Sequence, residues 1–217
     1  MQRKIFVVAA ALTAALLVFG FVLGMTFDSM RVAELENKLT ETDILWNDAR
    51  IQNIYYQLPL DSGKLCGSLL EGNLEFNNKI YEDGKKIEKY EQVNRFSSSL
   101  ILEKKKYALL QMQFWINSIA LRKMCNTSYS TIVYFYSFND ESATVRQRLE
   151  SEALSELKQK CGNGIMLIPL PIDIGLSSVN IIKSQYNITE TPSILVNETT
   201  LLSGLKTLND LEATVKC

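Results

Sequence analysis

Cysteine chemistry is the first possibility to consider, because the chain of 217 residues holds four cysteines and no histidine. The absence of histidine excludes Ser-His-Asp and Cys-His catalysis and any histidine-ligated metal. The cysteines are widely spaced, at Cys66, Cys125, Cys161 and Cys217, so they form no Cys-x-x-Cys motif. We therefore predict no catalytic residue, no metal and no cofactor. Four cysteines allow three pairings, and for Cys66 and Cys125 the alternative is two reduced, buried thiols.

Other chemical motifs are missing as well. We find no phosphate-binding loop and no serine-nucleophile motif. The 23 basic and 24 acidic residues balance, which argues against a basic protein that coats nucleic acid, and we expect no nucleic-acid partner. The run Lys104-Lys105-Lys106 and the acid-rich segment 140–156 are both typical of solvated helix faces.

The N-terminal segment has the length and composition of a membrane span. Residues Ile5 to Phe27 contain 23 consecutive positions without a charge, enough to cross a hydrocarbon core of about 30 Å. We predict an uncleaved signal anchor in residues 1–30, and a cleaved signal peptide is the alternative. Arg3 and Lys4 precede the span, so the N-terminus should be cytoplasmic and the rest extracytoplasmic, in a single-pass protein of the lipid bilayer.

Two features agree with an extracytoplasmic location. Cysteines can pair in such a compartment. Three N-x-S/T sequons, at Asn126, Asn187 and Asn197, are candidate glycosylation sites. Sequons occur often by chance, so whether they are used stays open.

The middle of the chain, residues 31–127, has helical periodicity. Apolar positions at three-four spacing predict a helix that ends at Pro59, followed by two more helices around 66–90 and 109–119. The polar stretch Gln92–Ser99 between the last two predicts a turn, and hence an antiparallel hairpin. Residues opposite one another in such a hairpin have a constant index sum, and that of Cys66 and Cys125 places the turn at about residue 95 or 96. We therefore expect this pair to form a disulfide. A long coiled coil is less favoured than a small bundle, because the apolar positions are interrupted by polar residues.

The remaining residues, 128–217, predict an alternating domain of order β-α-β-α-β-β-α. An apolar run from Thr131 suggests a buried central strand. The first helix should turn one apolar face inward, and Thr207 with Asp210 forms a capping-box pattern for the last helix. The predicted inner face of the first helix consists of Val145, Leu149, Ala153, Leu157 and Cys161. The fold class is thus α/β, with a transmembrane helix and a helical stalk before this domain.

This order resembles the thioredoxin fold, and two segments resemble it locally. Residues 186–196, Tyr-Asn-Ile-Thr-Glu-Thr-Pro-Ser-Ile-Leu-Val, are similar to the stretch that leads into the cis-proline strand of that family. The resemblance implies that Pro192 is the cis proline and that Thr191 precedes it. Residues 134–142, YFYSFNDES, are similar to the first core strand and redox loop. The resemblance covers 128–217 and nothing before it.

The chain departs from the family at the residues that carry its chemistry. The redox loop of the family has Cys-x-x-Cys at the start of the first helix, where the thiolate is stabilised. Here the corresponding positions are Asn139 and Ser142. Asp140 and Glu141 add negative charge at that helix terminus, which suits a cap and disfavours a thiolate. The usual oxidoreductase mechanism is therefore not available at this site. Whether the protein is an enzyme stays open, and the missing cysteine pair favours a protein that is not one.

The thioredoxin topology also places the prolines and the other cysteines. Pro169 and Pro171 lie in one strand, which suits the sheet edge that the second strand occupies in this fold. The first and last helices should end at the same end of the sheet, so Cys161 and Cys217 are expected to meet there. The final turn would have to loosen, because Cys217 lies off the apolar stripe of the last helix.

Three functions fit these features. The first is a redox-inactive, membrane-anchored module that binds polypeptide near Thr191 and Pro192, in a chaperone-like or assembly role. The second is a thiol–disulfide oxidoreductase that uses cysteines outside a Cys-x-x-Cys motif, with Lys158 and Lys160 near Cys161. The third is a structural or oligomerising stalk. The partner would be a polypeptide client or another membrane protein, and the oligomeric state is not predicted.

Overall fold

The fold is known from a computed structural model, which describes residues 2–55, 62–93, 98–215 and 217. The chain divides into two compact units, Met1–Asn47 and Asp48–Cys217. Helix α1 (Gln2–Tyr55) makes up the first unit and continues into the second. The domain limits predicted from the sequence, 30/31 and 127/128, differ from this division.

The predicted transmembrane segment is not supported. The uncharged run from Ile5 to Phe27 is part of helix α1, which continues without a break into charged sequence up to Tyr55. Over the described residues, no helix combines the length and the apolar character that crossing a membrane requires. The predictions of an N-terminal transmembrane helix and of a single-pass membrane protein are therefore wrong.

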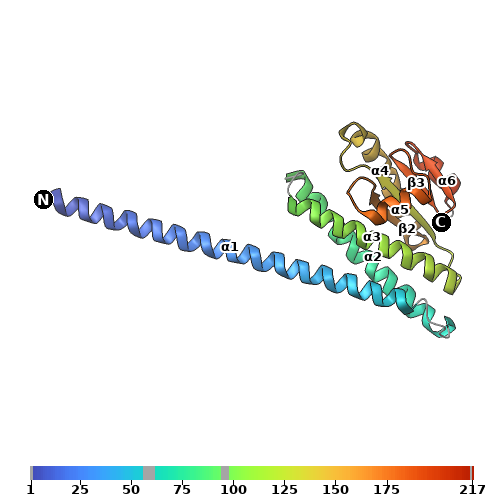
Figure 1. The fold of residues 1–217 in the computed structure, drawn as a ribbon, viewed down its shortest axis with the longest axis horizontal. Coiled ribbons are helices and arrows are strands. Elements are labelled where there is room, and N and C mark those ends of the chain that lie inside the picture. Colours follow the sequence, from blue (N-terminus) through green and yellow to red (C-terminus); the bar gives the residue numbers. More distant parts are fainter. Residues whose placement is uncertain (1, 56–61, 94–97, 216) are drawn as a thin grey trace. The chain divides into compact units, whose positions relative to one another are not determined.

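Helices α2 (Ser62–Val93) and α3 (Ser98–Cys125) form a hairpin, as Figure 1 shows. Their interface contains Phe76 and Phe114, whose rings meet edge to face at 6.1 Å. A polar contact is also buried there, because the Asn73 amide donates to Ser118 Oγ at 3.1 Å. The center of the predicted turn, residues 94–97, and the predicted helix end at Pro59 lie outside the described residues.

The C-terminal part alternates strands and helices. The strands are β1 (Ser130–Tyr136), β2 (Ile165–Pro171), β3 (Ser193–Val196) and β4 (Thr200–Ser203). The α-helices between and after them are α4 (Thr144–Cys161), α5 (Ser177–Gln185) and α6 (Leu208–Thr214). Short 3-10 helices, η1 (Glu141–Ala143) and η2 (Gly162–Gly164), flank α4. This is the order of elements that the sequence indicated for residues 128–217.

The four strands form one mixed sheet in the order β2-β1-β3-β4. Strand β1 is parallel to β2 and antiparallel to β3, and β3 is antiparallel to β4. Strand β2 lies at an edge, so the missing N–H groups of Pro169 and Pro171 cost no ladder hydrogen bond. The N–H of Ile172 instead faces inward and donates to the Tyr136 carbonyl at 2.9 Å.

Both faces of the sheet are covered. On one face α4 and α6 complete an apolar core, whose members are Ile132, Tyr134, Leu154, Leu157, Ile165, Ile194, Val196, Leu211 and Val215. On the other face α3 packs against β1 and β2. The fully buried Met166, Ile168 and Leu170 alternate with the core residues of β2 and so point to that side. The hairpin and the sheet therefore share one core.

The predicted inner face of helix α4 is right for Ala153, Leu157 and Cys161, which lie in or against the core, but wrong for the first half of the helix. Val145 and Leu149 are 63% and 46% exposed, whereas Gln147 and Glu150 are buried beside Leu154 and Leu157. Hydrogen bonds explain why these two polar side chains are buried. The Gln147 side chain accepts the Ser137 N–H at 2.6 Å, and Glu150 accepts the Lys206 N–H at 3.1 Å. Hydrogen bonds to the neighbouring loops thus hold these two side chains inside. The acid-rich segment is not entirely a solvated face.

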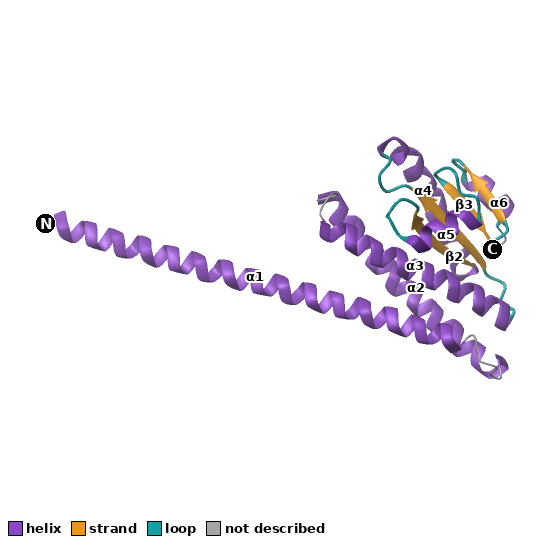
Figure 2. Ribbon diagram, in the orientation of Figure 1, coloured by secondary structure: helices purple, strands orange, loops and turns teal. Residues whose placement is uncertain are grey.

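The fold class predicted for the whole chain is also wrong. Figure 2 shows that helix predominates and that the sheet is small, so the chain is mostly helical with a small mixed sheet. The predicted class counted a transmembrane helix that the described residues do not support. Three long helices, α1, α2 and α3, precede the sheet, and α3 packs against it.

Candidate functional site

The cis-proline turn is the best-defined element of the candidate site. The Thr191–Pro192 peptide bond is cis, as the family resemblance implied. Pro192 is buried and leads directly into β3, and its carbonyl accepts the Gly204 N–H at 3.0 Å. Ser193 closes the turn from inside, because its hydroxyl donates to the Glu190 carbonyl at 2.7 Å. The turn is thus fixed on both sides of Thr191.

Thr191 itself is half-buried and makes no hydrogen bond within the described residues. Backbone groups usually find a partner, either in the protein or in solvent. The N–H and carbonyl of Thr191 are therefore available to a chain that lies beside the turn.

Strand register brings the degenerate redox loop next to this turn. Phe135 pairs with Ser193, so continuing the antiparallel ladder places Ser137 near Thr191. Asn139 and Ser142 follow in the loop, and both are exposed. Asp140 caps the turn there, with the Ser142 N–H and hydroxyl both donating to Oδ1 at 2.9 and 2.6 Å. The Ser142 hydrogen bonds hold the pKa of the Asp140 carboxyl below its usual value.

Asp173, which follows β2, forms hydrogen bonds with this loop. Its carboxylate accepts the Ser137 hydroxyl at 2.5 Å, the Phe138 N–H at 2.8 Å and the Asn139 N–H at 3.0 Å. Burial acts to raise the pKa of Asp173, but these hydrogen bonds outweigh it and hold the pKa below its usual value. The backbone donors of the loop, which would stabilise a thiolate or another anion, are therefore already used by this side chain. No motif in the sequence indicates this role of Asp173.

The helical hairpin contributes to the same loop. Lys104 on α3 is only 6% exposed, and its ammonium lies 4.0 Å from the ring centroid of Phe138. Such a cation–π contact is worth roughly 0.5–2 kcal/mol, depending on desolvation. The prediction that Lys104-Lys105-Lys106 is a solvated face is therefore wrong for Lys104, because α3 lies against the sheet.

The four cysteines form two disulfides, which confirms the predicted pairing. Cys66 joins Cys125 across the hairpin, with a Cα–Cα distance of 5.6 Å. Cys161 joins Cys217, with a Cα–Cα distance of 4.9 Å. Helix α6 ends at Thr214 and Val215 is extended, so the last turn is loosened as expected. Each disulfide fastens one end of a helix, and neither lies at the loop of Asn139 and Ser142.

The lysines near Cys161 have other partners. The Lys158 ammonium donates to the carbonyls of Gly162 and Ile165, both at 2.7 Å. Burial lowers the pKa of Lys158. Lys160 pairs with Glu212 at 2.7 Å. Both cations serve to hold chain segments together, which removes the feature that favoured a redox role for Cys161.

The three sequon asparagines all have left-handed backbones, with φ of 48° at Asn126, 52° at Asn187 and 49° at Asn197. Asn126 and Asn187 are exposed. Asn197 is not free, because its amide oxygen accepts from Arg122 at 2.7 Å and from the Thr131 N–H at 3.0 Å. Its amide nitrogen, the atom that glycosylation would use, donates to Ser130 at 3.3 Å. Glycosylation at Asn197 would therefore disrupt this network, and at the other two positions it stays a prediction.

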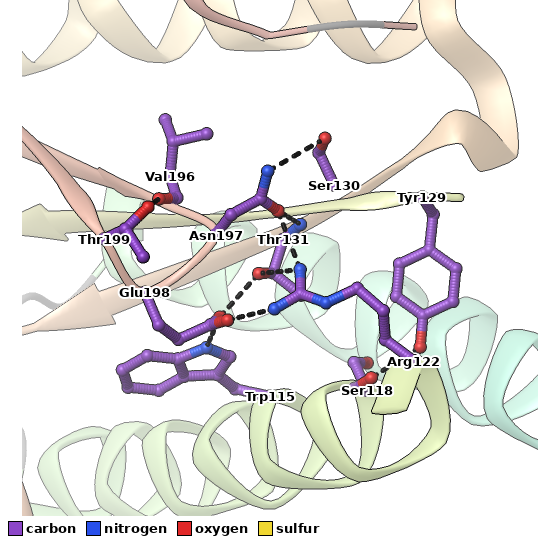
Figure 3. Close-up of polar contacts among 10 residues, drawn as sticks. All are labelled: Trp115, Ser118, Arg122, Tyr129, Ser130, Thr131, Val196, Asn197, Glu198 and Thr199. Atoms are coloured by element: carbon purple, nitrogen blue, oxygen red, sulfur yellow. Dashed lines mark hydrogen bonds and ion pairs between the residues drawn. The ribbon is translucent and has the colours of Figure 1, made fainter. Parts of the chain in front are cut away.

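Asn197 belongs to a polar cluster that joins α3 to the sheet, shown in Figure 3. Glu198 is its center: the Trp115 indole donates to it at 2.8 Å and the Thr131 hydroxyl at 2.5 Å, and Arg122 forms an ion pair with it. The Glu198 side chain is only 15% exposed. The polar groups of the cluster bond to one another, so we assign the cluster to holding the hairpin on the sheet rather than to binding a ligand.

Comparisons with known proteins add no functional assignment. No protein-family model matches the sequence, and neither does any curated protein. Several solved structures are similar to part of the chain, including the following two. One is a malarial protein with 19% identity and a TM-score of 0.31, over 39% of this chain and 91% of that one. The other is thioredoxin-2, a component of malaria parasite protein secretion machinery, with 20% identity and a TM-score of 0.31, over 40% of this chain and 80% of that one. The thioredoxin-like character of residues 128–217 rests on the strand order and on the cis proline described above.

Proposed function

We propose that this protein is a polypeptide-binding module with a thioredoxin-like domain that has no thiol chemistry at its redox loop. The observation that carries the proposal is the unpaired backbone of Thr191, held between the fixed carbonyls of Glu190 and Pro192. An extended polypeptide can pair with such a backbone segment by main-chain hydrogen bonds. These hydrogen bonds involve the backbone of the bound polypeptide and do not depend on its side chains, which suits a chaperone-like or assembly role.

The chemistry of the adjacent loop supports binding rather than catalysis. Asn139 and Ser142 stand where the family has cysteines, and Asp173 uses the nearby N–H groups. A client that lies along Thr191 would therefore meet Asn139 and Ser142 and no nucleophilic sulfur. It would be held and released without forming a covalent bond.

The experiment uses the full chain and an alkylated, permanently unfolded polypeptide as the probe. Amide chemical shifts are followed by NMR during a titration. We expect the largest changes at Thr191, Ser193 and the loop 139–142. Changes confined to other surfaces, or none up to millimolar probe, would rule out binding at this turn.

A matched pair of variants sharpens the test. Thr191→Arg places a long side chain where the client strand would run, so it should weaken binding by at least about tenfold, or 1.4 kcal/mol. Thr200→Arg is the control, because Thr200 is exposed on the edge strand β4. Equal affinities for the two variants would contradict the proposed site.

A further inference from the structure

Glu150 is a fully buried acid on a helix that is otherwise rich in exposed charge. It lies in the middle of α4 and has no exposed surface. Its Oε1 accepts the backbone N–H of Lys206 at 3.1 Å. Its Oε2 has no hydrogen-bond partner within the described part of the chain. A buried carboxylate with one oxygen unpaired is costly, and so this group needs an explanation.

The segment that Glu150 contacts is also the one that braces the cis proline. Two residues before Lys206, the Gly204 N–H donates to the Pro192 carbonyl at 3.0 Å. One residue after it, Thr207 begins α6 with a capping box to Asp210. Residues 204–206 therefore connect three points: the buried carboxyl of Glu150, the carbonyl of Pro192 and the start of α6.

Few other charges act on Glu150. Lys206 attracts it, and Tyr134 on β1 also interacts with it, but the Tyr134 hydroxyl donates to the Gln147 carbonyl at 2.9 Å. Asp210 on α6 is occupied by its cap, and Arg146 lies one turn before Glu150 on α4 itself. Strands β2, β3 and β4 and helix η2 carry no titratable side chain. Burial dominates and raises the pKa of Glu150 to about 7, while the N–H and ammonium of Lys206 lower it.

We propose that Glu150 is a protonation-controlled latch: the neutral carboxyl keeps residues 204–206 closed against α4, and its ionisation opens them and releases the Pro192 carbonyl. The direction follows from linkage. A carboxyl that holds its proton more tightly when buried than when hydrated must favour the hydrated, open arrangement once it is ionised. The latch is local, because the capping box at Thr207 and the pairing of β4 with β3 limit the opening on either side.

The consequence for the cis-proline turn depends on the function proposed above. Opening removes the Gly204 hydrogen bond that fixes one side of the turn, so Thr191 loses its defined position. Polypeptide affinity should then fall as the pH rises through neutrality. The latch itself does not depend on that function and can be tested without any polypeptide.

The test is amide hydrogen exchange of Gly204 and Lys206 in the full chain, measured by NMR and corrected for the intrinsic effect of pH. In the wild type we expect protection at both amides to fall by at least about tenfold between pH 5 and pH 8. In Glu150→Gln, which cannot ionise, protection should change by less than about twofold. Glu152→Gln is the control, because Glu152 is an exposed acid on the same helix and should behave as the wild type.

Two results would overturn the latch. The first is equal pH dependence in the wild type and in Glu150→Gln. The second, which needs no variant, is a midpoint for the loss of protection that differs from the carboxyl titration of Glu150 followed by carbon NMR. Affinity for the alkylated polypeptide is then measured at pH 6 and pH 8. No binding at either pH would reject the proposed function and leave the latch standing, whereas pH-independent binding would show that the latch does not control that site.

Discussion

The indole N–H of Trp115 donates to a carboxylate oxygen of Glu198 at 2.8 Å, across 83 positions of sequence. Trp115 belongs to α3 and Glu198 to the turn between β3 and β4, so this contact joins the helical hairpin to the sheet. The same carboxylate pairs with Arg122, also on α3. One side chain thereby anchors the helix that packs against β1 and β2.

Glu198→Gln should therefore destabilise the fold by about 2–3 kcal/mol, because it leaves the Arg122 guanidinium without its counter-charge in a largely buried place. Glutamine has the size of glutamate and keeps an oxygen that can accept from Trp115. The loss of stability therefore measures the contribution of the Glu198 charge. Denaturant unfolding measures it. The control is Glu152→Gln, whose pair with Arg148 is exposed and should contribute less than about 0.5 kcal/mol. Equal losses would mean that the buried ion pair adds nothing.

The disulfides should act as structural fasteners of similar strength. The pairs Cys66–Cys125 and Cys161–Cys217 close loops with sequence separations of 59 and 56. Replacing either pair by alanine should cost about 4 kcal/mol by the loop-entropy model. Urea unfolding of the two double variants checks this value. The thiol–disulfide alternative predicts something else: mild reductant would open one pair in the folded protein, and re-oxidation would be coupled to a substrate thiol.

The stability of the fold should depend on pH through Glu150. Its pKa is about 7 in the folded state, against an ordinary value of 4.5, because burial disfavours its charge. The neutral carboxyl of Glu150 thus contributes its full stabilisation of the fold below about pH 4.5, and this contribution is lost as the pH rises through about 7. Glu150→Gln should match the wild type at pH 4 and exceed it at pH 8 by at most about 3 kcal/mol. Chemical denaturation at the two pH values provides the measurement, and a wild type more stable than the variant at pH 8 would contradict it.

These groups also show which features the sequence could and could not predict. The pairing of Cys66 with Cys125 follows from helix periodicity and a turn, and Pro169 and Pro171 indicate an edge strand by their missing N–H groups. Both inferences use local rules. The inward turn of Glu150 cannot be obtained in that way, because its partner Lys206 lies 56 positions away. Polar residues that satisfy distant backbone groups look the same in sequence as solvated ones.

The redox loop offers the most direct test of how Asp173 suppresses thiol chemistry. Asn139→Cys with Ser142→Cys restores the Cys-x-x-Cys spacing beside cis Pro192. In thioredoxin-like sites a helix terminus and free N–H groups lower the thiol pKa below about 8.5. Here the N–H groups of Phe138 and Asn139 already donate to the Asp173 carboxylate. We therefore expect the first thiol of the double variant to titrate at or above about 8.5 and to attack disulfides slowly.

Adding Asp173→Asn removes the competing charge and should lower that pKa by about one unit or more. Thiolate absorbance in the ultraviolet follows the titration, and the rate of insulin reduction reports the activity. Asp210→Asn is the matched control, because Asp210 caps α6 and does not contact the loop. A low thiol pKa with Asp173 intact would show that its carboxylate does not block the site. The missing thiol activity of the natural loop would then trace to Asn139 and Ser142 rather than to Asp173.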